Sequence, residues 1–151
     1  MTKEELKESL LNVYPEAVVE EGGEWLTLQI EAASLLNFAR DLQNKAEWDF
    51  NYLFCQTCVD WKTHFTVVYF LRSLTHRHSL VVKVKIDRNN PEIESVQHLW
   101  KTAELNEREI FDLFGVKFNH HPDLRRILLT DDWNGYPLRK DYEDPVNIIK
   151  L

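Results

Sequence analysis

Two consecutive segments have the hydrophobic pattern of β-strands, and this pattern restricts the possible folds more than any other feature. Residues 64–74, HFTVVYFLRSL, are apolar on both faces, which is typical of a strand in the middle of a sheet. Residues 78–87, HSLVVKVKID, alternate between apolar and polar side chains. The side chains expected to face inward are Leu80, Val82, Val84 and Ile86, and those expected to face outward are Lys83 and Lys85. A turn at 75–78 joins the two strands, so the chain is built on a β-sheet.

Helical and strand patterns alternate before this pair. The expected elements are a helix capped by Thr2 and Glu5 and ended by Pro15, a hairpin of strands at 17–21 and 24–30, a helix at 32–45 and a strand at 52–61. The order is therefore helix, two strands, helix, three strands. It predicts an α+β fold, in which helices lie on a mixed β-sheet as a two-layer sandwich. With 151 residues, the chain has room for one domain with its own core.

The pattern changes after the strands. Residues 94–114, ESVQHLWKTAELNEREIFDLF, look helical, with a restart at Thr102 as an alternative, and Gly115 is placed to cap the C-terminus. Residues 119–151 are rich in Asn, Asp, Pro and Gly and have little periodicity, yet their interleaved aromatics argue against disorder. We therefore expect an α+β core domain at residues 1–118 and a C-terminal extended interface arm of the same domain at 119–151.

Charge and hydropathy limit the classes of partner. The net charge of −7 argues against a general nucleic-acid binder and against unaided adsorption to anionic lipid. No apolar run approaches the roughly 20 residues of a membrane span, and the start, MTKEELKESLL, lacks the pattern of a signal peptide. We expect cytosolic residence, with membrane association only through a partner.

Cys55 and Cys58 form a CxxC pair, which redox and zinc sites also use. Residues three apart on a strand point to opposite faces, and the sequence has no second CxxC. These features favour buried structural thiols.

A metal site at His120, His121 and Asp123 is also disfavoured, because adjacent residues rarely chelate one ion. A turn fixed by Pro122 explains this run better. The sequence contains no GxSxG, GxGxxG or P-loop motif, and a pair of acids such as Asp131 and Asp132 arises by chance among 25 acidic residues. We expect no catalytic residue, no cofactor and no metal in this chain.

The run 107–128 combines charges with aromatic residues in a way that suggests an interface. Glu107, Arg108 and Glu109 fan across roughly 200° of a helix, so at least one glutamate lies beside the apolar face. Such a glutamate needs a partner, and Arg125 and Arg126 are the nearest candidates. A plain surface ion-pair network is the alternative, in which the acids one turn away on the helix satisfy Arg108. The predicted interface residues are Glu107, Arg108, Glu109, Asp112, Arg125, Arg126, Arg139 and Lys140.

These motifs resemble a known family. EREIFDLFGVKFNHHPDLRRIL (107–128) and DDWNGYPLRKDY (131–142) are similar to the signature region of the thirty-kilodalton subunit of respiratory complex I, which in bacteria is the C subunit. The resemblance covers most of the chain, roughly from the second helix to Tyr142. It implies a structural subunit without flavin, iron–sulfur cluster or metal, in the peripheral arm of a proton-translocating NADH:quinone oxidoreductase.

The resemblance also implies partners and a location. The protein would dock on the large quinone-pocket subunit and near the iron–sulfur subunits, on the cytoplasmic side of the cell inner membrane, and support electron transfer from NADH to quinone. One alternative is the equivalent subunit of a membrane-bound nickel–iron hydrogenase, or of a quinone reductase fed by ferredoxin or deazaflavin. Another is a free-standing thiol or metal enzyme.

Overall fold

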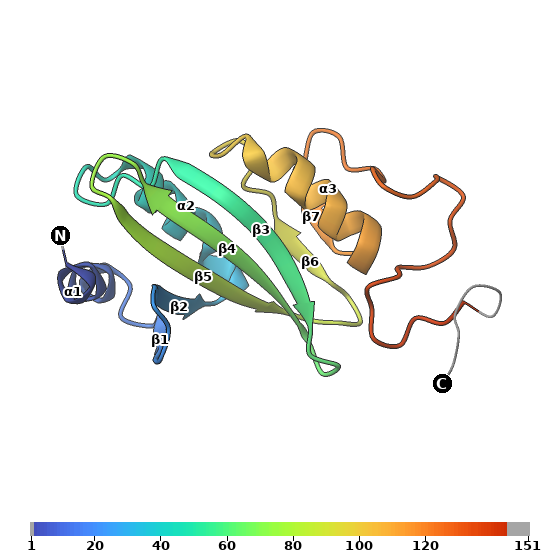
Figure 1. Ribbon diagram of the computed structural model, residues 1–151, viewed down its shortest axis with the longest axis horizontal. Helices are drawn as coiled ribbons and strands as arrows, with labels where there is room; N and C mark the ends of the chain where they lie inside the picture. The colour runs from blue at the N-terminus through green and yellow to red at the C-terminus, as the bar shows by residue number, and fades with distance from the viewer. Residues whose placement is uncertain (1, 145–151) are drawn as a thin grey trace.

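The computed structural model describes residues 2–144 (Figure 1). Its elements are α1 (Lys3–Val13), β1 (Val18–Glu20), β2 (Leu26–Ile30), the 3-10 turn η1 (Ala32–Ser34), α2 (Leu35–Asn44), β3 (Tyr52–Asp60), β4 (Phe65–Ser73), β5 (His78–Ile86), β6 (Glu92–Glu94), α3 (Thr102–Phe114) and β7 (Lys117–Asn119). Thr2 and Glu5 cap α1 reciprocally, as the sequence predicts.

Five strands form one sheet in the order β1-β2-β5-β4-β3. The β2–β5 pair is parallel and the other pairs are antiparallel, so the sheet is mixed. In Figure 1, α2 lies behind this sheet, while α3 lies beside the edge strand β3. The predicted α+β fold and the inner position of β4 are confirmed.

One face of the sheet packs on the helices. All four apolar residues predicted to point inward from β5 are at most 7% exposed. They meet the apolar stripe of α2, which includes Phe38 and Leu42, because apolar residues recur there at the helical period. Trp100 closes the core beside α3, where its ring N–H donates to the carbonyl of Phe50 at 2.9 Å. Burial of large side chains on this one face drives the assembly of the two layers.

The helix predicted at 94–114 is wrong in its first part. The chain first forms β6, which pairs in parallel with β7, and α3 begins at Thr102, the start that the sequence offered as an alternative. The reason is that Ser95 and Val96 turn back to bind the carboxylate of Glu107, which a continuous helix would prevent. Gly115 ends α3 with a φ of 79°, in the left-handed region that suits glycine.

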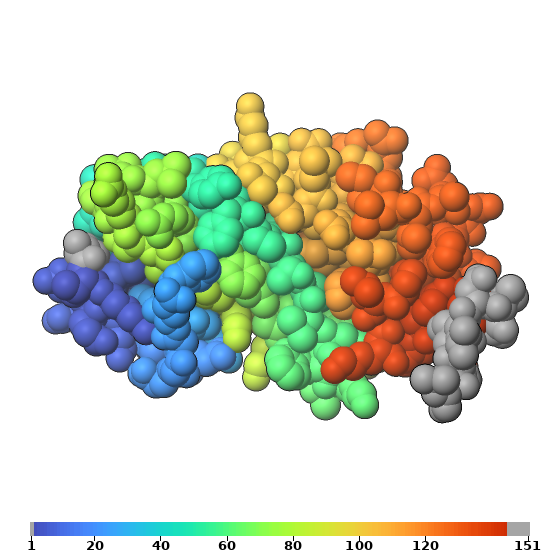
Figure 2. Space-filling view, in the orientation of Figure 1, coloured from blue at the N-terminus to red at the C-terminus, as the bar shows by residue number. Residues whose placement is uncertain are grey.

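Beyond β7 the chain continues without a helix or strand as far as Asp144, and we call residues 120–144 the arm. Figure 2 shows the arm, in orange and red, packed along one end of the molecule. Residues 145–151 of the predicted arm lie outside the described residues. Among residues 2–144, no helix combines the length and apolar character needed to cross a bilayer.

Candidate partner interface

Asp112 of α3 fixes the first part of the arm. Its carboxylate is 0% exposed, and one oxygen accepts the backbone N–H groups of Ile127, Leu128 and Leu129 at 2.7–3.1 Å. The other oxygen accepts Nη1 of Arg126 at 2.9 Å. Burial alone raises the pKa of Asp112, but the bonds from Leu129, Arg126, Leu128 and Ile127 outweigh it and lower that pKa. The ionised carboxylate therefore holds this turn of the arm, which we call the Asp112 cradle (Asp112, Arg126 and 127–129).

Arg126 also links the Asp112 cradle to the next part of the arm. Its guanidinium donates to the backbone carbonyls of Asp112, Trp133 and Gly135 at 2.9–3.1 Å. It also lies 5.0 Å from the ring centre of Tyr136, within the range of a cation–π contact. Because its side chain is only 11% exposed, Arg126 acts as an internal support of the arm.

Arg139 holds the middle of the arm at the end of α3. Its Nε donates to the carbonyl of Phe114 at 2.6 Å, and its guanidinium lies 5.1 Å from the ring of Phe65 and 5.2 Å from that of Tyr136. A Cβ on Gly115 would come within 2.7 Å of the Tyr136 ring. Glycine therefore serves both the helix end and the close approach of the arm.

Asp60, at the end of β3, clamps the last part of the arm. It accepts Nε and Nη2 of Arg88 at 2.9–3.0 Å, the N–H of Lys140 at 2.8 Å and the N–H of Lys62 at 2.7 Å. Arg88 also bridges to Asp141 at 2.9 Å. The bond to Arg88 lowers the pKa of Asp60 despite burial. The sequence analysis did not single out Asp60. The signal that could have identified it is an acidic residue at an inward-facing position of a strand.

Glu107 lies inside the domain. It is 0% exposed and accepts bonds from the Ser95 hydroxyl, the N–H of Val96 and the amide of Gln56. Burial raises the pKa of Glu107, because these neutral donors offset only part of the loss of hydration. The prediction that a glutamate of this helix lies beside the apolar face is confirmed.

The expected pairing of that glutamate with Arg125 or Arg126 is wrong. Arg126 is taken by Asp112, and Arg125 pairs with Asp123 at 3.0 Å. Arg108 does not bind the acids of its own helix either; it donates to the backbone carbonyls of Arg125 and Arg126 at 3.2 Å each. The backbone of the arm, which has no strand partner, competes successfully for this guanidinium.

Exposure separates the eight predicted interface residues into three groups. Glu109, Arg125 and Lys140 are exposed, Arg108, Arg126 and Arg139 are partly buried, and Glu107 and Asp112 are buried. The first group can touch a partner directly, whereas the contacts above assign the others to the inside of the chain. The surface near them carries large exposed apolar side chains: Leu105 (56%), Ile127 (39%), Leu128 (62%) and Leu138 (52%). These four residues with Glu109, Arg125 and Lys140 are called the docking surface below.

The two cysteines do not form a site. Cys55 is in register with Phe70 and Cys58 with Val67, on opposite faces of the sheet. Cys58 is buried, which raises its pKa to about 12. Cys55 is only partly buried, so the expectation of two buried thiols is corrected for that residue.

The adjacent histidines also diverge. His120 bonds the carboxylate of Glu94 at 2.7 Å, and His121 bonds the backbone carbonyl of Glu104 at 3.0 Å. The N–H of His121 closes a turn on the carbonyl of Phe118 at 3.3 Å, as the turn prediction requires. No group of three or more His, Cys, Asp or Glu side chains in residues 2–144 is arranged to hold a metal ion.

The sequence matches a known family along most of its length. The family model described as "Respiratory-chain NADH dehydrogenase, 30 Kd subunit" matches residues 28–146. The chain is 42% identical over 137 residues to a protein of Moorella thermoacetica that is named as the C subunit of NADH-quinone oxidoreductase, covering 89% of this chain and 91% of the relative. The C subunit of Chloroherpeton thalassium is 49% identical over 96 residues, which are 62% of this chain and 40% of the relative.

Some relatives are much longer than this chain. The matched part spans 40% of the Chloroherpeton protein and 19% of a Phocaeicola vulgatus protein, which is named as the C/D subunit of NADH-quinone oxidoreductase and is 45% identical over 97 residues. The matched segment is therefore only a part of these longer proteins.

Two solved structures share the fold. The trypsin-resistant fragment (1-134) of Nqo5 superposes with a TM-score of 0.67 and 28% identity, over 80% of this chain and 98% of the fragment. A chain of the membrane-bound sulfane sulfur reductase, an archaeal respiratory membrane complex, gives a TM-score of 0.80 and 27% identity, over 93% of this chain and 85% of that one. The second match covers so much of this chain that it includes part of the arm.

Proposed function

Since the chain belongs to the family of the 30 kDa subunit of respiratory-chain NADH dehydrogenase, we propose that it is a non-redox structural subunit in the peripheral arm of a proton-translocating NADH:quinone oxidoreductase. In this role it carries no catalytic residue and no cofactor. It docks on the large quinone-pocket subunit beside the iron–sulfur subunits, and supports assembly and electron transfer from NADH to quinone. It reaches the membrane only through these partners, on the cytoplasmic side of the cell inner membrane.

The observation that supports the proposal most strongly is the structure of the arm. Its inner side is bonded to its own domain, and its outer side exposes apolar side chains. Asp112, Arg126 and Asp60 bond the arm to its own domain, and the exposed apolar side chains of the docking surface remain uncovered in the isolated chain. An arm held in one conformation before binding loses little conformational entropy when a partner covers it. Apolar side chains beside a few charges are what a stable subunit interface requires.

A second candidate is the equivalent subunit of a related membrane complex. The TM-score of 0.80 with a chain of the sulfane sulfur reductase supports it, because the same fold serves there in another respiratory machine. By extension, a nickel–iron hydrogenase or a quinone reductase fed by ferredoxin or deazaflavin is included. A flavin-containing NADH-oxidising module that co-purifies with the chain favours the first proposal. Nickel-binding cysteine pairs in the large partner favour the second.

A matched pair of substitutions tests docking. Leu128 is 62% exposed on the arm, and Leu74 is 59% exposed in the turn between β4 and β5. Changing either residue to Glu leaves the isolated chain folded, so circular dichroism and melting should match the wild type. In cells that contain the variant as their only copy, Leu128→Glu should lower the amount of assembled complex. Covering a leucine is worth roughly 1.5–3 kcal/mol, or about tenfold or more in binding.

Native gels of solubilised membranes measure assembled complex, and quinone reductase activity should fall in the same proportion. Leu74→Glu should assemble normally. Normal assembly with activity lost would instead assign this surface to the reaction. Equal assembly of both variants and the wild type would refute docking through the arm.

A further inference from the structure

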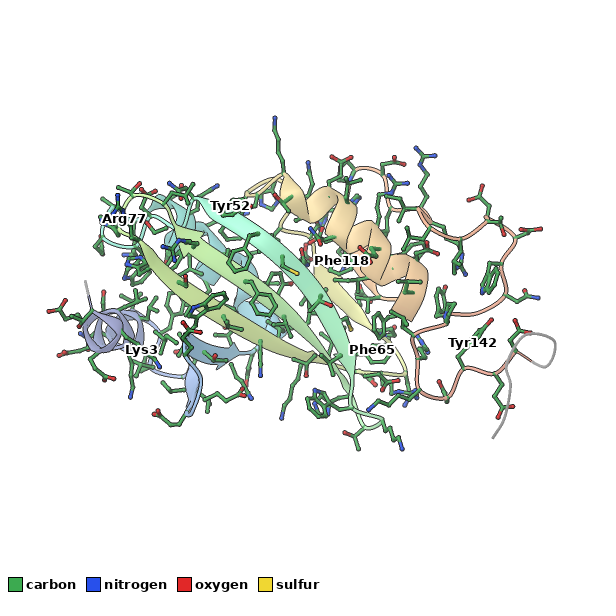
Figure 3. All side chains as sticks on the ribbon, viewed as in Figure 1. Lys3, Tyr52, Phe65, Arg77, Phe118 and Tyr142 are labelled. Atoms are coloured by element: carbon green, nitrogen blue, oxygen red, sulfur yellow. The ribbon has the colours of Figure 1, made fainter. Side chains whose placement is uncertain are left out.

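The seam between α3 and β3 contains a hollow. β3 is an edge strand of the sheet, and α3 packs beside it. Figure 3 shows this seam along β3, between the labels of Tyr52, where β3 begins, and Phe65, where β4 begins. The hollow measures about 140 Å³, and its walls come from β3, α3 and the arm; they include Cys55, Thr57, Glu109, Leu113 and Leu138. Since Glu109 and Leu138 belong to the docking surface, the hollow lies within that surface.

The size of the hollow suits a side chain better than a small molecule. Pockets for cofactors and drug-sized ligands measure roughly 300–1,000 Å³. A cavity of about 150 Å³ accepts a group of the size of benzene. At about 140 Å³, the hollow therefore has room for one large side chain of a partner.

The hollow carries a single charge, which is negative. Glu109 is the one charged residue in its walls, and no lysine, arginine or histidine of residues 2–144 lines it. Within the same residues, the Glu109 carboxylate makes no hydrogen bond or ion pair. The arginines next to the lining residues in sequence are bound elsewhere: Arg108 donates to carbonyls of the arm, and Arg139 donates to the carbonyl of Phe114. This part of the chain therefore supplies no cation for Glu109.

A partner that covers Glu109 must supply the group that this carboxylate lacks. Glu109 is exposed, so water solvates it in the isolated chain. A carboxylate that loses this water and gains no partner destabilises the state in which it is buried. Its neighbours in the hollow include Ile110, Leu113 and Leu138, which are apolar and offer no side-chain donor. A side chain with an aliphatic stem and a cationic tip matches both features, because the stem packs on the leucines while the tip meets the carboxylate.

We propose that the hollow receives an arginine side chain of the partner subunit, whose stem lies on Leu113 and Leu138 and whose guanidinium pairs with Glu109. The proposal rests on the proposed function, since it requires that a partner covers the docking surface. Arginine suits the site better than lysine, because its planar fork binds a carboxylate through two bonds and is more weakly hydrated. Arginines that fill pockets are also among the residues that contribute most to binding.

The thiol of Cys55 tests the charge of the hollow in the isolated chain. Burial and the charge of Glu109 both raise the pKa of Cys55, so the carboxylate acts on this thiol. The isolated full chain is treated with a cationic or an anionic methanethiosulfonate, and modification of Cys55 is followed by mass spectrometry. Cys58 is buried and does not compete. After correction for the rates with a free thiol, we expect the cationic reagent to react roughly tenfold faster than the anionic one.

A matched pair of variants assigns this preference to Glu109. Glu109→Gln should remove it. Glu8→Gln should keep it, because Glu8 is an exposed glutamate of α1, at the end of the molecule away from the arm (Figure 1). Equal corrected rates for the two reagents in the wild type overturn the proposal, whatever the chain binds.

The same thiol reports whether the hollow is filled in the complex. In wild-type complex purified from membranes, both reagents should modify Cys55 roughly tenfold more slowly than in the isolated chain, or slower still, because a filled pocket in an interface excludes solvent. Unchanged reactivity of Cys55 in the complex overturns the arginine contact.

Assembly in cells separates this proposal from the proposed function. With the variant as the only copy, Glu109→Gln should lower the amount of assembled complex by about fivefold or more, since it leaves the guanidinium buried without its partner. Glu8→Gln should assemble normally. Both isolated variants should melt like the wild type, because neither glutamate makes an ion pair within residues 2–144. If Glu109→Gln melts early, the reactivity of Cys55 in the wild-type complex decides instead.

The result is compared with that of Leu128→Glu. Normal assembly of Glu109→Gln with loss of assembly in Leu128→Glu overturns the arginine contact and leaves docking through the arm intact. Normal assembly of both variants overturns both proposals.

Discussion

Replacing Asp112 by Ala should release the arm while the core stays folded. The substitution removes the acceptor of one guanidinium bond and of three backbone N–H bonds. Removing one partner of a buried charge pair typically costs about 3–5 kcal/mol. The cost is limited here, because an arm that opens can hydrate the same groups in water. We therefore expect the population of open arm to rise by roughly two to three powers of ten, at about 1.4 kcal/mol for each.

The core should change much less than the arm. Within residues 2–144, no buried hydrophobic residue of the core lies beyond Phe118, so an open arm leaves the main apolar cluster in place. The midpoint of thermal unfolding should fall by only a few degrees, since about 1 kcal/mol corresponds to roughly 2–4 °C in a domain of this size. A collapse of the whole domain would show that the cradle belongs to the core.

Limited digestion with trypsin measures the open arm. The arm offers cleavage sites at Arg125, Arg126, Arg139 and Lys140, and cleavage follows the open population when opening is fast. We expect cleavage of Asp112→Ala to be about a hundredfold faster than that of wild type, on the energies above. Asp131→Ala is the matched control, because it makes the same chemical change on the exposed part of the arm. Equal cleavage of the two variants would refute the reasoning.

Acid should reproduce the effect of the substitution. The folded pKa of Asp112 is lowered from 3.8, so its contribution is present above that pH and is lost as the pH falls through the folded pKa. Digestion with an acid protease should therefore show wild type and Asp112→Ala converging at pH values below about 3.8. A difference that stays constant into strong acid would mean that the charge of Asp112 is not what holds the arm.

Two further predictions concern buried groups. The pKa of Glu107 is raised from 4.5, so its stabilising contribution is complete below that pH and is lost as the pH rises through the folded pKa. Glu107→Gln, which stays neutral, should gain stability relative to wild type between pH 5 and pH 9 in urea unfolding, and parallel curves would contradict this. With a pKa of about 12, Cys58 should react with iodoacetamide only on unfolding, well after Cys55, and no disulfide between them should form. Equal rates for the two thiols would contradict their placement.

The sequence predicts the sheet well because its signals are local. Alternation along β5, the apolar run of β4 and the glycine after α3 each depend on a few neighbouring residues and on backbone sterics. The first part of the run 94–114 is predicted poorly, because a contact between Ser95 and Glu107 interrupts the helical run, whereas the alternative start at Thr102 is the observed one. Helical periodicity is present in that run, but the backbone N–H of Val96 binds the buried carboxylate of Glu107 instead of continuing a helix.

The sequence predicts that a charged residue of the signature region lies beside the apolar face, but it does not predict which group that residue binds. An acid beside the apolar face of α3 follows from the angle between successive residues, whereas its partner depends on where the chain returns. Asp60 illustrates the limit, since it meets Lys140 across 80 residues of sequence. Nothing at either position alone indicates that contact.

The density of charges in 107–142 follows from the absence of secondary structure in the arm. A segment without helix or ladder has backbone N–H and C=O groups that need partners wherever it packs against its own domain. Asp112 accepts three such N–H groups, and Arg126 donates to two such carbonyls, those of Trp133 and Gly135, and Arg108 to two more. Carboxylates and guanidinium groups suit this task because each makes several strong bonds at once. The same side chains therefore lie inside the molecule, and its outer apolar residues are left free to meet a partner.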